Sequence, residues 1–84
     1  MKLTIITPDK PVFDGEVTSV TIPGSAGSFE ILKDHAPIVS TLEDGKVIIR
    51  TSGKTEEVIR IIGGVVEAAH NEVTVLAEGI TEEA

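Results

Sequence analysis

Apolar and polar residues alternate in short runs along most of the chain, and turn residues separate the runs every eight to twelve positions or so. Leu3 and Ile5 fall on one face of such a run, and Val20 and Ile22 fall on one face of another. No long window has the period of an amphipathic helix. The pattern predicts an all-β fold of nine or ten short antiparallel strands, arranged as a sandwich or a barrel.

Turn residues set the limits of the predicted strands. A first strand holds Leu3 and Ile5 and is closed by Pro8. The others are expected at residues 12–13, 16–22, 28–32, 38–42, 47–51, 56–62, 65–69 and 72–77. We expect Asp14-Gly15 to form a turn or a bulge, and Gly63-Gly64 to break a strand.

Two hairpins are predicted in the second half of the chain. Residues 43–46 are expected to form a tight turn in which Gly45 takes the left-handed conformation, so that residues 47–51 pair back on the preceding strand. His70-Asn71 is expected to join the last two strands. Both predictions rest on local turn chemistry alone.

The length of 84 residues allows one domain, residues 1–84, with a thin core. Its last residues, 79–84, are expected to be a frayed tail. Thr81 could cap a helix and Glu82 and Glu83 suit the positive end of a helix dipole, but no helix body follows.

Composition excludes several classes of partner. The net charge of −7, without a Lys/Arg cluster or interleaved aromatic residues, argues against binding nucleic acid or anionic lipid. No apolar run approaches the roughly 20 residues that span a bilayer, and Pro8 ends the N-terminal apolar stretch too early for a signal peptide. The absence of cysteine fits a reducing compartment. We expect a cytoplasmic protein that meets a membrane only through a partner.

Candidate catalytic motifs have simpler explanations. Residues 53–55, Gly-Lys-Thr, resemble the end of a phosphate-binding loop, but Ile48 stands where that motif needs glycine and the segment joins two strands. Asp34 and His35 are adjacent, so their side chains diverge on a strand, and no nucleophile elbow is present. We therefore predict no catalytic residue.

Cofactor and metal sites are not indicated either. His35 and His70 are the only imidazoles and lack the spacing of metal ligands, while the neighbouring acids 43–44 and 56–57 are typical of solvated surface charge. We predict no metal and no cofactor. A thin sandwich of Ile and Val tends to leave an apolar face for a partner, so the sequence indicates a binding module.

Residues 24–37, Gly-Ser-Ala-Gly-Ser-Phe-Glu-Ile-Leu-Lys-Asp-His-Ala-Pro, carry a specific resemblance. They are similar to the Gly-x-x-Gly-x-x-Gly-Ile-Leu-Pro-Gly-His-Ala-Pro signature of the epsilon subunit of F-type ATP synthases. Residues 12–17, 42–45, 63–67 and 71–77 resemble other segments of that family, so the likeness covers most of the chain. The departures are Glu30, Lys33 and Asp34, where the family usually has Gly, Pro and Gly; they make this segment more charged.

The resemblance implies a flattened two-sheet β-sandwich of about ten short antiparallel strands. It also implies a non-catalytic rotor subunit that braces the gamma subunit on the c-ring and couples proton- or sodium-driven rotation to ATP synthesis. It implies a peripheral position at the cytoplasmic face of the cell inner membrane, with no small-molecule substrate. By position, it places the loop Ala26, Gly27 and Ser28 toward the c-ring, and Thr7, His35 and Ser40 near gamma.

Longer members of that family add a C-terminal helical hairpin that inhibits ATP hydrolysis. A chain ending at Ala84 would be expected to couple without such inhibition. The alternatives are a lipoyl- or biotinyl-type carrier domain, although Lys10, Lys46 and Lys54 lack the flanking residues of such carriers, and a free-standing small β-sandwich that binds a small molecule.

Overall fold

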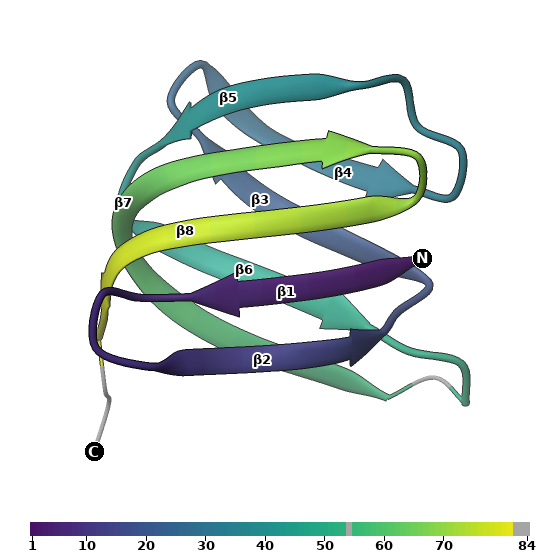
Figure 1. The fold of residues 1–84 in the computed structure, drawn as a ribbon, viewed down its shortest axis with the longest axis horizontal. Helices are drawn as coiled ribbons and strands as arrows, with labels where there is room; N and C mark the ends of the chain where they lie inside the picture. Colours follow the sequence, from purple (N-terminus) through teal and green to yellow (C-terminus); the bar gives the residue numbers. More distant parts are fainter. Residues whose placement is uncertain (54, 82–84) are drawn as a thin grey trace.

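The computed structural model describes residues 1–53 and 55–81, and it contains strands and no helix within them. The eight strands are β1 (Lys2–Ile6), β2 (Pro11–Glu16), β3 (Ser19–Gly24), β4 (Gly27–Leu32), β5 (Ile38–Leu42), β6 (Gly45–Arg50), β7 (Glu56–Ala69) and β8 (Glu72–Ile80). The predicted all-β class is confirmed (Figure 1). A search of the described residues for a helix long and apolar enough to cross a membrane finds none.

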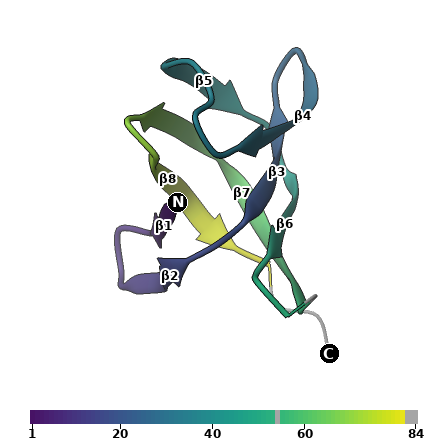
Figure 2. The ribbon, with the colours of Figure 1, turned by 90° about the vertical axis from the view of Figure 1, so that its right-hand side faces the viewer.

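The strands form two layers (Figure 2). Hydrogen bonds join them in the order β2-β1-β8-β7-β5-β3-β4, with β6 paired to β3 and β7. The first layer holds β2, β1, β8, the second half of β7 and β5, while the second layer holds β4, β3, β6 and the first half of β7. The sandwich is therefore one continuous sheet folded on itself.

β7 passes from one layer to the other at Gly63 and Gly64, whose φ angles are 48° and 126°. Before this pair, the buried side chain on β7 is at an odd-numbered position, Ile61; after it, the buried side chain is at an even-numbered position, Val66. The face of β7 that points into the core therefore switches at the two glycines. A Cβ atom at Gly64 would lie 2.1 Å from the carbonyl oxygen of Leu76, so only glycine fits. The expected break between two strands is thus a bend inside one strand, which joins two of the nine predicted segments and leaves eight strands.

The predicted pairing of β6 back on β5 is wrong. Both strands instead pair with β7 in one continuous register, since Leu42 faces Gly64 and Gly45 faces Ile61. Among the described residues, the glycines with positive φ are 27, 53, 63 and 64. Gly45 therefore does not take the predicted left-handed conformation. Gly45 is needed for a different reason: a Cβ there would lie 2.9 Å from Pro23 Cβ.

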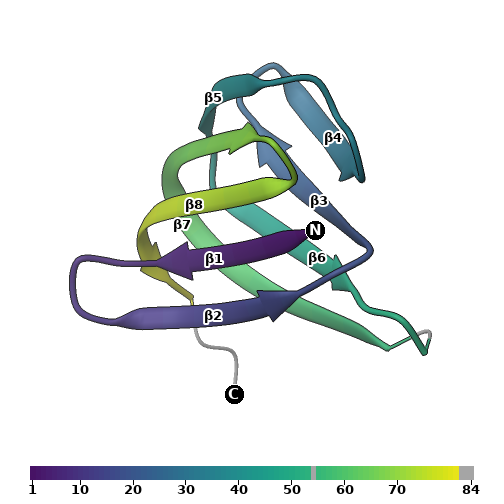
Figure 3. The same cartoon turned by 45° about the vertical axis from the view of Figure 1, so that its right-hand side comes forward.

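Three further details differ from the sequence predictions. β1 pairs with β8 in parallel, so the strands are not all antiparallel (Figure 3). Asp14 and Gly15 lie inside β2 and pair with β1 instead of forming a turn. Gly79 and Ile80 belong to β8 and pair with β7, so they are not frayed, whereas Glu82 and Glu83 of the expected helix start lie outside the described residues.

The core lies between the layers and consists of aliphatic side chains. Its members are Leu3, Ile5, Val17, Val20, Ile22, Ile31, Leu42, Val47, Ile49, Ile61, Val66, Ala68, Val73, Val75 and Ala77. The predicted inward pairs on the first and third strands are confirmed, because all four side chains are fully buried. A core of this kind fixes which residues of each strand remain on the outside.

Candidate partner-binding surface

The outer face of the first layer is organised in three rows that cross the strands. The first row contains the charged residues Lys2 and Glu72 together with Ala69. The second row is mainly polar and contains Thr4, Thr74, Glu67 and Val39. The last row is mainly aliphatic and contains Ile6, Leu76, Val65 and Thr41. We call the last set the outer row. Its side chains come from β1, β8, β7 and β5, which lie side by side (Figure 3).

The outer row presents aliphatic surface to water. Leu76 is 49% exposed and Val65 is 36% exposed, and Val39 in the neighbouring row is 69% exposed. The row continues into a shallow hollow lined by Ile6, Thr7, Pro8, Leu76 and Ala77. When a partner covers aligned apolar side chains of this kind, the burial stabilises the complex by about 25 cal/mol per Å² of apolar area.

The β3–β4 hairpin tip, residues 24–28, adjoins the same end of the outer row. Gly24 faces Gly27 across the tip, and Gly27 has φ 130°. The Ser25 N–H donates to the Thr41 carbonyl at 3.0 Å, and Thr41 Oγ1 donates to Ser25 Oγ at 2.9 Å. These two bonds tie the tip to β5, so the outer row and the tip form one connected surface.

The β4–β5 corner, residues 33–37, lies at the other end of β4 (Figure 1). Its turn is closed by the His35 N–H, which donates to the Leu32 carbonyl at 3.1 Å. The His35 ring nitrogen Nδ1 lies 2.6 Å from the Ala36 carbonyl oxygen. A strand of six residues spans roughly 20 Å, so the corner and the hairpin tip are separate parts of the surface.

The six residues assigned to partners from the sequence do not gather into one site. Ala26, Gly27 and Ser28 lie in the hairpin tip, and Thr7 lines the hollow beside the outer row. His35 is in the corner at the opposite end. Ser40 is half-buried and faces Val66, on the inner side of β5, and its Oγ donates to the Thr41 carbonyl at 3.0 Å.

Sequence reasoning missed the residues that make the surface continuous, namely Thr41, Val65 and Leu76. One signal was present: β7 and β8 carry adjacent apolar residues, as in Val65-Val66 and Val75-Leu76, so both faces of these strands are apolar. That signal identifies two apolar faces but does not show that they align across four strands.

The outer face of the second layer has a different character. Arg50 on β6 lies 3.5 Å from a Glu30 carboxylate oxygen and 3.3 Å from one of Glu56, so its guanidinium joins β4 and β7. Lys46, Arg60 and Val58 line a shallow depression on the same face together with Thr81. Its exposed apolar side chains therefore stand among charges.

The described residues contain no cluster of side chains that could act as metal ligands. No three His, Asp or Glu side chains there are grouped so that they could hold a metal ion. His70 lies in the β7–β8 turn and His35 in the β4–β5 corner. What the described surface offers is shape, aliphatic area and hydrogen-bonding loops, which are the properties of a protein-binding surface.

Comparison with known proteins gives consistent matches. Residues 1–83 match the family described as "ATP synthase, Delta/Epsilon chain, beta-sandwich domain". The chain is 45% identical over 80 residues to the ATP synthase epsilon chain of Chlorobium limicola, which covers 95% of this chain and 91% of that protein. It is 40% identical over 79 residues to the ATP synthase epsilon chain of Sulfurimonas denitrificans, which covers 94% of this chain and 61% of that protein.

Solved structures agree with the fold. A chain in the mitochondrial ATP synthase of Euglena gracilis, described as OSCP/F1/c-ring in rotational state 1, matches with a TM-score of 0.88 at 22% identity, over 94% of this chain and 51% of that one. A chain in the central stalk and c-ring of the Tetrahymena thermophila mitochondrial ATP synthase matches with a TM-score of 0.78 at 22% identity, over 96% and 65%. At this identity the likeness is one of fold.

Proposed function

Because this chain belongs to the ATP synthase delta/epsilon-chain β-sandwich family, we propose that it is the epsilon-type subunit of the central stalk of an F-type ATP synthase. In this role it has no active site of its own. It braces the gamma subunit on the c-ring, so that ion-driven rotation reaches the catalytic sites of other subunits. The family match favours this interpretation over a lipoyl or biotinyl carrier domain.

One observation carries the assignment of surfaces: the outer row and the hairpin tip meet at one end of the sandwich and are joined by the bonds between Ser25 and Thr41. A subunit that braces a shaft on a ring needs two adjacent contacts on a connected support. We assign the outer row to gamma, since its aliphatic side chains suit the apolar centre of a protein interface. We assign the hairpin tip to the polar loops of the c-ring.

The individual residues follow from this arrangement. Ala26, Gly27 and Ser28 form the exposed end of the hairpin that would contact the c-ring. Thr7 contacts gamma from the hollow beside Leu76. Ser40 lies on the inner side of β5, away from the outer row, so its assignment to gamma needs a separate contact. His35 makes a second, separate contact with gamma at the corner.

The energy available from the outer row is modest for each side chain. Fully burying a Val or Leu side chain is worth about 1.5–3 kcal/mol, and roughly half of that remains to be gained by Leu76. Leu76, Val65 and Val39 together therefore provide a small apolar centre, around which Thr41 and Thr7 supply polar contacts. This composition is typical of the centre and rim of protein interfaces.

The location follows from the partners. We propose that the subunit is peripheral, held at the cytoplasmic face of the cell inner membrane through the ATP synthase complex. The net charge of −7 gives it no attraction to anionic lipid head groups, so its attachment depends on gamma and the c-ring.

The test is reconstitution with gamma and the c-ring of the same enzyme. The chain should co-purify with gamma, and ATP synthesis by the reconstituted complex should depend on its presence. Replacing Ser28 with Glu should weaken the contact with the c-ring and leave binding to isolated gamma unchanged. A chain that neither binds gamma nor supports synthesis would refute the proposed function.

A further inference from the structure

The corner between β4 and β5 is held by hydrogen bonds between two residues that lie 37 positions apart. The Asp34 N–H donates to Asn71 Oδ1 at 2.6 Å, and Asn71 Nδ2 donates back to Asp34 Oδ1 at 3.0 Å. The two bonds run in opposite directions between the same two residues. They join the corner to the β7–β8 turn, which lies next to it in Figure 1.

Asp34 has a backbone conformation that residues other than glycine seldom adopt. Its φ is 65°, in the left-handed region, which is uncommon for residues other than glycine and carries a free-energy cost. Aspartate tolerates this region better than most residues when its side chain is hydrogen-bonded. The contacts with Asn71 supply such bonds, so the strained conformation and the pair depend on each other.

Asn71 is itself fixed from two other directions. His70 and Asn71 have φ of 52° and 61°, the pair of positive angles that a tight two-residue hairpin requires. The Asn71 carbonyl also accepts a hydrogen bond from the Lys2 N–H at 2.9 Å. Asn71 therefore sits on a rigid frame made by β1, β7 and β8, and the corner is the less supported partner.

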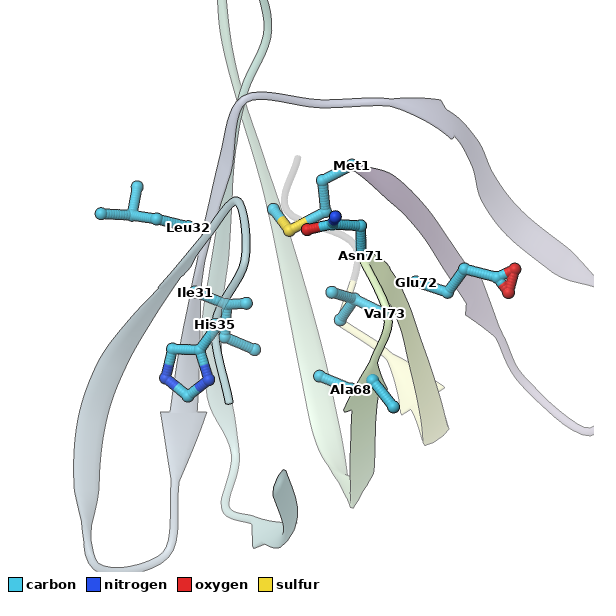
Figure 4. Close-up of a pocket in the computed structure, with 9 residues that line it drawn as sticks. Met1, Ile31, Leu32, His35, Ala68, Asn71, Glu72 and Val73 are labelled. Atoms are coloured by element: carbon cyan, nitrogen blue, oxygen red, sulfur yellow. The ribbon is translucent and has the colours of Figure 1, made fainter. Parts of the chain in front are cut away.

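A narrow cleft separates the corner from this frame (Figure 4). His35 and Ile31 line one side of the cleft, and Ala68, Asn71 and Val73 line the other. His35 directly follows Asp34 in the chain. Whatever fixes the backbone at Asp34 therefore sets where the imidazole stands relative to the first layer.

We propose that Asp34 and Asn71 form a positioning clamp, which holds the corner so that His35 is presented to the gamma subunit in one orientation. This inference rests on the proposed function, because gamma is the partner that His35 would meet. The clamp acts by preorganisation: a corner that is already ordered loses less conformational entropy when the complex forms.

The first experiment measures the clamp in the chain alone. Asn71→Gly removes the side-chain amide and keeps a residue suited to positive φ, while His70→Gly makes the same change one position earlier and leaves the amide in place. By NMR-detected hydrogen exchange, the Asp34 amide should exchange about tenfold faster in Asn71→Gly, as expected for the loss of two hydrogen bonds. It should stay close to its original rate in His70→Gly.

The second experiment measures affinity for gamma. Asn71→Gly should weaken binding about fivefold, and His70→Gly should not. Asp34→Asn keeps a side-chain oxygen that accepts from Asn71 Nδ2, so it should bind nearly as well as the unaltered chain. If the clamp acts through the imidazole, Asn71→Gly should have no further effect on affinity in a chain that already carries His35→Ala.

The outcomes test the clamp and its positioning role separately. An unchanged exchange rate at Asp34 in Asn71→Gly would overturn the clamp. Faster exchange with unchanged affinity for gamma, or an undiminished effect in the His35→Ala background, would overturn its positioning role. If the unaltered chain does not bind gamma, the proposed function and the positioning role both fail, and the exchange rates still decide whether the clamp holds the corner.

Discussion

The two outer faces of the sandwich expose similar apolar side chains in different surroundings. Leu76 on the first layer is 49% exposed and Val58 on the second is 47% exposed, so exposure alone does not distinguish them. Their neighbours do. Leu76 is aligned with Ile6 and Val65 across three strands, whereas Val58 shares its face with the ion pairs that Arg50 makes.

Cross-strand register, more than exposure, therefore distinguishes the two faces as candidate docking surfaces. An isolated aliphatic side chain among charges is ordinary protein surface. The aligned side chains of the outer row form a patch that a partner can dehydrate in one step, because no residue within this row is charged.

The largest loss of stability is expected at the bend where β7 passes from one layer to the other. A Cβ atom at Gly64 would lie 2.1 Å from the Leu76 carbonyl oxygen, and φ there is 126°. Gly64→Ala should therefore lower the free energy of unfolding by about 4 kcal/mol or more, or prevent folding. Urea denaturation measures this loss.

Gly53→Ala is the control for the bend. Gly53 also has positive φ, at 90°, but a Cβ there would meet nothing within 4 Å. Its loss of stability should be only about 1–2 kcal/mol. If Gly64→Ala and Gly53→Ala lost the same stability, positive φ alone would account for both losses, and the close approach of Gly64 to the Leu76 carbonyl oxygen would contribute nothing.

The second prediction compares the faces directly. Leu76→Glu places a charge in the centre of the outer row, and it should lower affinity for gamma about a hundredfold because the charge would have to be dehydrated in the complex. The fold should survive, since the side chain is half exposed. Val58→Glu makes the same type of change on the second layer and should alter affinity less than about twofold. Equal losses in both variants would remove the distinction between the faces.

The third prediction concerns the connection between the outer row and the hairpin tip. Thr41→Val keeps the side-chain shape and removes the hydroxyl that donates to Ser25 Oγ. It should cost about 1 kcal/mol and lower the melting temperature by about 4–8 °C for a domain of this size. Thr74→Val, on the same face but in the middle row, should shift stability by less than about 0.5 kcal/mol. A larger shift from Thr74→Val than from Thr41→Val would argue against the connection.

The smallest effect is expected from the charges of the second layer. Arg50→Gln removes both ion pairs, whose side chains are all about half exposed, and should cost less than about 1 kcal/mol. The loss should shrink further at high salt because of screening. Affinity for gamma should not change. A salt-independent loss of several kcal/mol would mean that these pairs hold the layer together.

The strands themselves could be predicted from local alternation. Leu3, Ile5, Val20 and Ile22 were placed on common faces, and all four side chains are fully buried. Alternation succeeds here because one face of each strand is buried, and a shift of one residue would turn every aliphatic side chain outward.

Partnerships between distant strands could not be predicted. Nothing in residues 2–6 indicates that they pair in parallel with residues 72–76, or that β6 follows β5 along β7 instead of folding back on it. Such pairings depend on contacts across the whole domain. Asp34 stood out in the sequence as a departure from the family signature, but its partner Asn71 is visible only in the fold.

β7 belongs to both layers, and this has a mechanical consequence. When two separate sheets pack face to face, only side-chain packing resists a sideways force, because no covalent bond or strand ladder joins the sheets. Here the peptide backbone continues through the bend at residues 63–64, so sliding would have to stretch covalent bonds or unzip a strand ladder. A twisting load that enters at one face would thus be carried to the other along a single strand with little shear.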